Sequence, residues 1–338
     1  MNWVTVSSSA ELPENWDGMA GDNIFLRRSF LSHLERVNPC GQRYSYLMDS
    51  NSIKAICVDY SLKLDIFTYS FLSLKLPVRI MGIPCSVSKP GFAVLPGFEA
   101  SMIQHFQALK GAKLILNSDL NLPGAHGVTL PTCKLPLSWA SVEDFLGSMR
   151  SGYRYRLKKA LKKWARVEVE YLSPAEFDQD LYRMYEQVYQ KSAAKLEKLS
   201  QGFFSQLPLP AKLIRASVQG RALGFAVVVE NGPELIFLFT GFDYSLQAGY
   251  DTYLNLLLEI IKYGLERGFS RIELGQTAEE TKLKLGAALH AKSMYIYHSN
   301  PLINKLAFRL AGLLSYKPPC FDFHVFKSGS VDSVSLPD

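Results

Sequence analysis

Residues 248–287 constrain the fold more than any other part of the sequence, because they combine a long apolar helix with a strand and a second helix. Apolar side chains recur there at helical spacing: Tyr250, Leu254, Leu257, Ile261 and Leu265. Further apolar residues widen this stripe, so we expect the helix to be covered on more than one side. Gly268 ends the helix, and a short apolar strand follows over residues 271–274. This pattern predicts a helix packed on a β-sheet.

The same order of helix end, glycine and short strand occurs earlier in the chain. Residues 106–116 have the sequence FQALKGAKLIL, and residues 263–274 have YGLERGFSRIEL. Segments rich in β-branched and aromatic residues precede both, and they predict strands over 44–48, 53–60, 64–72, 78–87, 213–218, 222–230 and 234–240. Because 338 residues suffice for two domains of ordinary size, we predict an α/β fold with two similar units and mixed, mostly antiparallel sheets.

Apolar periodicity and end signals predict further helices over residues 23–37, 100–109, 141–164 and 302–314. The last of these is amphipathic, and we expect it to pack on the second domain and not to act as a membrane anchor. Residues 117–129 are rich in proline and glycine and are expected to form an irregular connection. The polar tail from Ser328 is expected to be disordered.

A strongly basic helix is predicted near the middle of the chain. Residues 150–166 contain eight cations: Arg150, Arg154, Arg156, Lys158, Lys159, Lys162, Lys163 and Arg166. Such a segment is either a solvated linker or a site for phosphate groups or an anionic membrane surface. Only Tyr155 lies among the cations as a stacking surface, since Tyr153 and Trp164 fall on the apolar stripe. Small phosphorylated ligands are therefore favoured over generic nucleic-acid binding.

Several classes of protein are excluded by what the sequence lacks. The five cysteines are scattered without a CxxC spacing, which disfavours a disulfide framework or a zinc site and favours the reducing cytoplasm. None of the six histidines has metal-ligand spacing, so no metal is expected. We expect neither a signal peptide nor integral membrane association. The GxGxxG, GxxxxGK[ST] and GxSxG motifs are all missing from the sequence.

Three stretches together resemble the Fem-like branch of the GNAT acyltransferase superfamily, including its cellulose- and peptidoglycan-related acetyltransferase group. The first is NIFLRRSFLSHLE over residues 23–35, and the second is VEDFLGSMRSGYRYRLKKALKKWARVEVEYL over residues 142–172. The third runs from LGFAVVVE over residues 223–230 to YDTYLNLLLEIIKYGLERGFSRIELGQTAEETKLKLGA over residues 250–287. Two positions depart from the family pattern: Tyr250-Asp251-Thr252 replaces its SPG, and Lys284 replaces an arginine.

The resemblance implies two tandem GNAT-like domains joined by the basic helix. Their expected bounds are 1–140 for an acceptor or structural domain, 141–170 for the linker and first strand, and 171–327 for the acyl-donor domain, with a tail over 328–338. It also implies transfer of an acyl or aminoacyl group to a small-molecule or peptide amine. The donor is acyl-CoA or, alternatively, an aminoacyl-tRNA, and a degenerate pair acting as a binding protein is a third alternative.

The resemblance further implies particular site residues. The strand over residues 234–240 would offer backbone N–H groups to a developing oxyanion. Lys282 matches the family lysine and would stabilise the intermediate or a phosphate; Asp243 and Glu230 are candidate bases, and Tyr250 is a candidate acid for the leaving group. The donor is expected to contact Arg154, Lys158, Thr240, Ala248, Gly249 and Lys284, with its phosphates at the start of the helix near residues 248–250.

Overall fold

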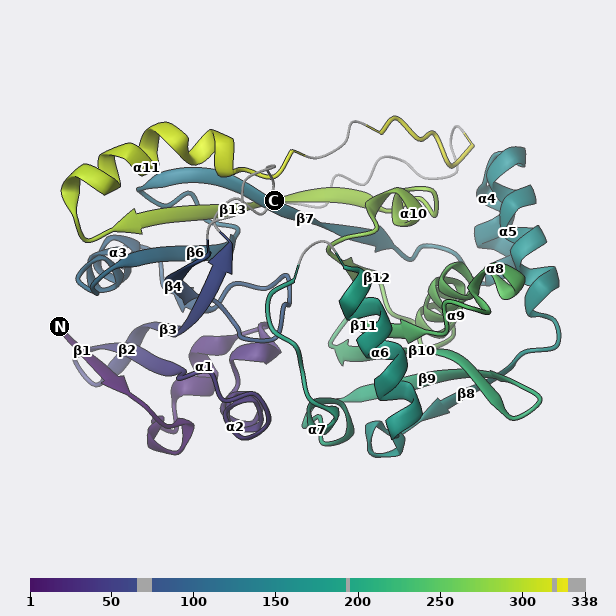
Figure 1. The fold of residues 1–338 in the computed structure, drawn as a ribbon, viewed down its shortest axis with the longest axis horizontal. Helices are drawn as coiled ribbons and strands as arrows, with labels where there is room; N and C mark the ends of the chain where they lie inside the picture. Colours follow the sequence, from purple (N-terminus) through teal and green to yellow (C-terminus); the bar gives the residue numbers. More distant parts are fainter. Residues whose placement is uncertain (66–74, 193–194, 318–320, 328–338) are drawn as a thin grey trace. The chain divides into compact units, whose positions relative to one another are not determined.

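The computed structural model describes residues 1–65, 75–192, 195–317 and 321–327 (Figure 1). The chain forms two compact units, each assembled from three separate segments. Unit 1 contains Met1–Pro131, Ala194–Leu209 and Ala291–Pro318, and unit 2 contains Thr132–Ala193, Pro210–His290 and Pro319–Asp338. The predicted strand over 64–72 lies largely outside the described residues, and the predicted disordered tail from Ser328 lies wholly outside them.

Unit 1 is built on a sheet in which, among the described residues, one neighbouring pair of strands is parallel. Its strand order is β1 (Asn2–Val6), β2 (Arg43–Asp49), β3 (Ser52–Asp65), β4 (Lys75–Met81), β6 (Ala112–Ser118) and β13 (Ala288–His298), with β5 (Phe92–Val94) beside β3. β4 and β6 are parallel, and helix α3 (Glu99–Gln107) connects them through the short strand β5. The remaining helices of unit 1 are α1 (Trp16–Ala20), α2 (Arg28–Val37), α7 (Gln201–Ser205) and α11 (Pro301–Leu314).

Unit 2 repeats this arrangement of strands and connecting helix. Its strand order is β8 (Glu168–Leu172), β9 (Ala211–Val218), β10 (Arg221–Asn231), β11 (Glu234–Phe242), β12 (Arg271–Gly275) and the second part of β7 (Ala125–Pro136). The first part of β7, up to Pro131, belongs to unit 1. β11 and β12 are parallel, and the long helix α9 (Thr252–Glu266) connects them. The other helices are α4 (Val142–Ser148), α5 (Ser151–Trp164), α6 (Gln179–Lys191), α8 (Gln247–Tyr250) and α10 (Glu279–Leu283). The predicted α/β class with mixed, mostly antiparallel sheets is confirmed.

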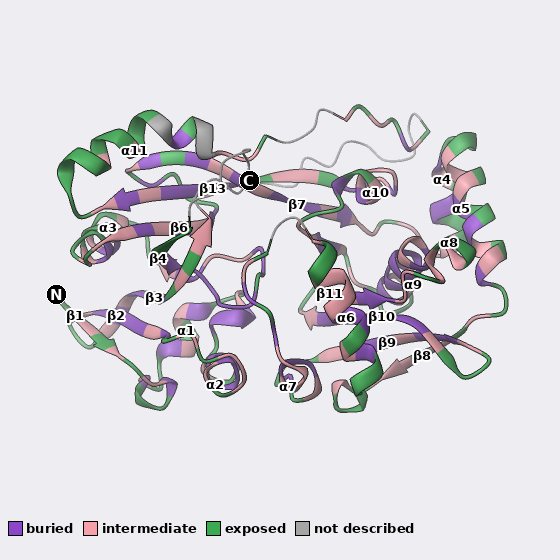
Figure 2. Cartoon of the chain, in the orientation of Figure 1, coloured by how far each residue is buried: buried purple, intermediate pink, exposed green. Residues whose placement is uncertain are grey.

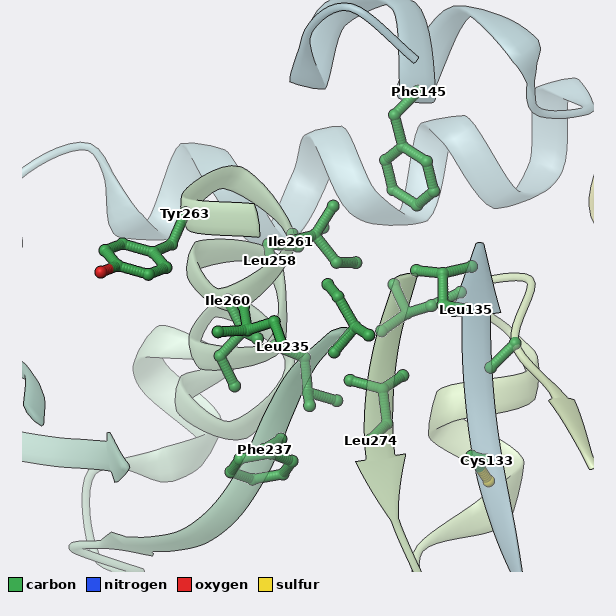
Figure 3. Close-up of a cluster of buried hydrophobic side chains, with 14 of the residues drawn as sticks. Cys133, Leu135, Phe145, Leu235, Phe237, Leu258, Ile260, Ile261, Tyr263 and Leu274 are labelled. Atoms are coloured by element: carbon green, nitrogen blue, oxygen red, sulfur yellow. The ribbon is translucent and has the colours of Figure 1, made fainter. Parts of the chain in front are cut away.

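Helix α9 organises the core of unit 2, as its apolar pattern predicts. Figure 3 shows Leu258, Ile260 and Ile261 of α9 in one buried cluster with Leu235 of β11 and Leu274 of β12. The one acid in this buried surface, Glu259, accepts hydrogen bonds from Trp164 Nε1 and the Tyr171 hydroxyl, each at 3.1 Å. The basic helix α5 is thereby fixed to α9 within unit 2.

The structure corrects several predictions. The strand predicted over 78–87 ends at Met81, because the chain turns away through Gly82 and Pro84. β7 begins at Ala125, inside the region predicted to be irregular, and β1 and β13 were not predicted. The predicted helix over 141–164 is broken at Met149 and Arg150, which have extended backbones. Helix α11 belongs to unit 1 and not to the second domain, so its predicted packing partner was wrong.

The described part of the chain has no helix that is both long enough and apolar enough to cross a membrane. The division into an acceptor domain, a linker and a donor domain, with bounds at residues 140 and 170, stays a prediction. It concerns the roles of the segments, whereas the two compact units are defined by their packing.

Two glycines allow helices to approach the β10–β11 hairpin closely. A Cβ added to Gly241 would lie 2.5 Å from the backbone nitrogen of Tyr185 in α6 and 2.5 Å from the Phe225 ring. A Cβ on Gly224 would lie 3.1 Å from Thr252 at the start of α9. Glycine at these positions lets a helix pack on each face of the hairpin.

We expect Gly241→Ala to lower the free energy of unfolding by about 1–3 kcal/mol, because the added methyl group has no room beside α6. The measurement is urea denaturation followed by circular dichroism. Gly147→Ala in α4 is the matched control, since a Cβ there meets nothing within 4 Å, and it should be neutral or stabilising. Equal unfolding midpoints for the two variants would contradict this account.

Candidate functional site

Strands β11 and β12 pair for only part of their length. Their parallel ladder joins Glu234 with Arg271, Leu235 with Ile272, and Ile236 with Glu273. β11 continues to Phe242, and no further pair between these two strands occurs in the described residues. On the side that faces β12, residues 237–242 of β11 therefore have no ladder of hydrogen bonds to a neighbouring strand. Backbone groups on such an edge can bind a ligand.

A β-bulge explains why the strands separate at this point. Val227 of β10 pairs with Phe239, whereas the next residue, Val228, pairs with Phe237, so Leu238 is an extra residue in β11. A bulge bends its strand and increases the local twist. β11 therefore turns away from β12 immediately after their last pair.

A buried lysine organises the turn that follows β12. The turn contains Gly275, Thr277 and Ala278 in left-handed conformations, with φ of 69°, 62° and 49°. Lys282 is 2% exposed, and its Nζ donates to the carbonyl oxygens of Gly275 at 3.2 Å, Gln276 at 2.7 Å and Thr277 at 2.7 Å. These three bonds use the three donors of the ammonium group. The geometry assigns Lys282 the positioning of this turn, while its contact with a reaction intermediate stays a prediction.

Buried titratable groups surround Lys282. Removal from water lowers its pKa to about 8, and Cys133, Glu279 and Glu273 partly oppose this shift. Burial raises the pKa of Cys133 to about 11, and burial also raises the pKa of Tyr253 on α9. Sequence reasoning missed this cluster, because it depends on the pairing of Cys133 in β7 with Gly275 in β12.

The loop between β11 and α9 is anchored by Asp243. One oxygen of its carboxylate accepts from the Ser245 backbone at 2.8 Å and the Ser245 hydroxyl at 2.6 Å, and the other accepts from Arg221 at 2.7 Å. The hydrogen bonds from Ser245, followed by those from Arg221, lower the pKa of Asp243. A lowered pKa weakens a general base. These contacts favour an anchoring role, although the predicted base role stays open to test.

The start of α9 is held by the basic helix. Lys163 Nζ donates to the carbonyl of Ala248 at 3.0 Å and pairs with Asp251 at 3.0 Å. Asp251, with φ of 46°, precedes the first residue of α9, so a carboxylate already lies where a helix dipole would favour a phosphate. Lys163 was not among the predicted site residues, because nothing in the sequence distinguishes it from the other cations of the helix.

Other predicted donor-site residues lie around this loop and the turn after β12. Gly249 is exposed, and the half-buried Tyr250 packs against the cluster that contains Trp164. The Thr240 hydroxyl donates to the carbonyl of Phe225 at 2.6 Å, across to β10. Lys284 is paired with Glu280, one helical turn earlier.

The remaining predicted residues lie elsewhere in unit 2. Glu230 accepts from the Tyr263 hydroxyl beside the β10–β11 turn, at the opposite end of the hairpin from Asp243. Arg154 donates to the carbonyls of Gly147 at 3.4 Å and Met149 at 3.2 Å, which fastens α5 to the end of α4. Lys158 is exposed on α5.

The corresponding parallel pair of unit 1 has no such separation. β4 and β6 pair to the last residue of β4, where Met81 lies beside Ile115. The chain then enters a largely buried loop over residues 82–88, which Asn117 holds by donating to the carbonyl of Val87 at 2.8 Å. In the part of the chain that the structure describes, unit 2 alone combines a parallel pair that separates along its length with an adjacent basic helix.

We expect Lys282→Met to lower the free energy of unfolding by about 2–4 kcal/mol, because three buried carbonyl groups lose their partner. The measurement is chemical denaturation at neutral pH. Lys284→Met is the matched control: its exposed pair with Glu280 should contribute about 1 kcal/mol or less. A similar small loss in both variants would contradict the positioning role.

The difference in unfolding free energy between the wild type and Lys282→Met should also depend on pH. Between about pH 8 and the ordinary lysine pKa of 10.5, the unfolded chain holds the Lys282 proton more strongly than the folded chain. The wild type should therefore gain stability relative to Lys282→Met as the pH rises through this interval. A constant difference from pH 7 to pH 10 would show that the folded-state pKa is not lowered.

The sequence of much of unit 2 is similar to a known family of domains. A family model described as "Acetyltransferase (GNAT) domain" matches residues 147–283. No curated protein matches the chain. Within the described residues, no group of three or more His, Cys, Asp or Glu side chains is placed to hold a metal ion.

Solved structures with the same fold cover most of the chain. The C-terminal domain of a putative lysylphosphatidylglycerol synthetase from Agrobacterium fabrum aligns with a TM-score of 0.55 and 11% identity, covering 89% of this chain and 96% of that one. L-PGS from Bacillus licheniformis aligns with a TM-score of 0.51 and 12% identity, covering 83% and 95%. FemX aligns with a TM-score of 0.50 and 11% identity, covering 79% and 90%. A GNAT-domain family model thus matches residues 147–283, and the solved structures share the fold that the resemblance to Fem-like proteins implies.

Proposed function

We propose that the protein transfers an acyl group from acyl-CoA to an amine acceptor. The observation that carries this proposal is the ladder-free edge of β11 after Ile236. The pantetheine arm of coenzyme A contains amide groups that can hydrogen-bond to such an edge as a neighbouring strand does. The thioester would then lie beside backbone N–H groups of residues 237–242, where a developing oxyanion is stabilised.

The reaction needs few side chains once the two substrates are aligned. The amine nitrogen attacks the thioester carbon, the C–N bond forms, and the C–S bond breaks. The amine loses a proton to a base, for which Asp243 and Glu230 are the candidates, and the departing thiolate gains one, for which Tyr250 is the candidate. The Lys282 ammonium sustains the shape of the turn at the end of β12.

The phosphates of the donor are assigned to side chains of α5 rather than to the start of α9. Asp251 and Lys163 already form an ion pair at that helix start. By contrast, Lys158, Lys159 and Lys162 are exposed and form no ion pair within the part of the chain that the structure describes. Helix α5 packs against both α8 and α9, so the helix itself lies beside the loop that leads out of β11.

An aminoacyl-tRNA donor is the second candidate, and one observation favours it. The Tyr155 side chain is 72% exposed among the cations of α5. An exposed aromatic ring on a cationic surface can stack on an unpaired base of a single-stranded nucleic acid. Titrating the protein separately with coenzyme A and with aminoacyl-tRNA distinguishes the two donors, and binding without transfer would indicate a degenerate binding protein.

We expect Lys158→Glu/Lys162→Glu to weaken coenzyme A binding about tenfold or more, because two exposed contacts to phosphate are replaced by repulsion. Isothermal titration calorimetry at constant salt measures the dissociation constant. Lys110→Glu, an exposed lysine of unit 1, is the matched control and should bind as the wild type does. If the double variant bound coenzyme A with wild-type affinity, the exposed lysines of α5 would not bind the donor, and α5 would be a solvated linker helix.

Asp243→Asn tests whether this carboxylate is a base or an anchor. We expect the KM for the donor to rise several-fold with an unchanged pH profile, because the loop loses its bond to Arg221. A base would instead show a lower kcat and loss of the acidic limb of the pH profile. Glu168→Gln, at an exposed carboxylate of β8, is the control and should leave the donor KM unchanged.

A further inference from the structure

Helix α11 exposes an unusual number of large apolar side chains. Leu302, Ile303, Leu306 and Phe308 are 79%, 47%, 52% and 53% exposed. Figure 2 shows α11 coloured as exposed over most of its described length. Single exposed apolar residues are ordinary on protein surfaces, but a group of them on one element indicates an interaction site.

The opposite side of α11 is fixed to unit 1. Ala311 is buried, and its carbonyl lies so close to Gly127 of β7 that an added Cβ would be 3.3 Å away. Ser315 Oγ accepts from the backbone of Val128 at 3.1 Å, and the Tyr316 N–H donates to the Val128 carbonyl at 2.8 Å. At the other end, Asn300 caps the helix by accepting from the backbone N–H of Leu302 at 2.9 Å. The exposed face is therefore presented by a helix whose inner face is already packed.

Cations lie within the exposed face. Lys305 and Arg309 are both exposed, and they are four residues apart, so they lie one turn apart on the same side of the helix. The spacing places them between Leu302 and Leu306 on one side and Phe308 on the other. Long basic side chains in this position can reach a charged surface while neighbouring apolar residues are inserted into it.

The charge of α11 and of the residues that flank it in sequence has one sign. Residues 299–321 contain no aspartate or glutamate, and the exposed Lys317 adds a third cation after the helix. An apolar face mixed with unopposed cations is complementary to lipid headgroups that carry negative charge. The helix has 14 residues, fewer than the roughly 20 needed to span a bilayer, so this chemistry is suited to a helix that lies in the interface.

We propose that α11 docks the protein peripherally on an anionic lipid bilayer. The apolar side chains enter the boundary between headgroups and acyl chains, and Lys305 and Arg309 bind the anionic headgroups. This property is separate from acyl transfer and would bring unit 1 to a membrane surface whatever the donor is.

Sedimentation with vesicles tests the proposal directly. The wild-type protein should bind vesicles of equal parts phosphatidylcholine and phosphatidylglycerol, and should bind pure phosphatidylcholine vesicles much more weakly. Leu306→Ser/Phe308→Ser should remove most of the binding. Leu120→Ser, at another exposed apolar position of unit 1, is the matched control and should bind as the wild type does. Because all these side chains are exposed, circular dichroism should show unchanged folding.

Charge variants separate the two contributions. Lys305→Gln/Arg309→Gln should lower the partition coefficient by roughly 25-fold, about fivefold for each cation near an anionic surface. Lys63→Gln/Lys110→Gln, which removes two exposed cations elsewhere in unit 1, should have no comparable effect. Equal binding to both kinds of vesicle, or no response to the α11 variants, would overturn the proposal. So would light scattering that shows a dimer abolished by Leu306→Ser/Phe308→Ser, since the face would then bind a second copy of the chain.

Discussion

The separation of β11 from β12 after Ile236 is the constraint on which the rest of unit 2 depends. The extra residue Leu238 bends β11, and the left-handed Gly275 ends β12 at the same level. Lys282 then fixes the following turn through three backbone carbonyls. Helix packing at Gly224 and Gly241 holds the neighbouring hairpin from both faces. The open edge is therefore a consequence of packing and register, and it does not require a mobile strand.

The two units share one arrangement of elements, but their parallel strands pair over different shares of their length. Both connect parallel strands through a helix, but unit 1 continues its ladder to Met81 and fills the adjoining space with its own loop. Asn117 secures that loop, whereas unit 2 has only the lysine-held turn after β12. Unit 2 also contains the basic helix. The parallel pairs of the two units thus differ by a few backbone hydrogen bonds.

Features with strong local patterns could be predicted from the sequence, and features made by distant pairing could not. Helix α9 follows from its apolar period, and β10 and β11 lie close to the strands predicted over 222–230 and 234–240. β7 and β13 were missed because their partners lie far away in sequence. Lys282 was singled out by resemblance, yet its three partners are backbone carbonyls that no residue pattern identifies. The bulge at Leu238 and the role of Lys163 likewise depend on register and proximity.

The interleaved composition of the units has a consequence for how the chain is made. β6 pairs with β13, and unit 1 also takes in Ala194–Leu209 and α11, so its sheet lacks a strand until residues 288–298 leave the ribosome. Unit 2 likewise takes β12's neighbour from the first half of the chain, through Thr132–Pro136 of β7. Domains commonly fold one after another during synthesis, the N-terminal one first. Here the nascent first half must wait for the second, and a fragment cut near residue 140 would expose an unpaired edge of β6 to aggregation.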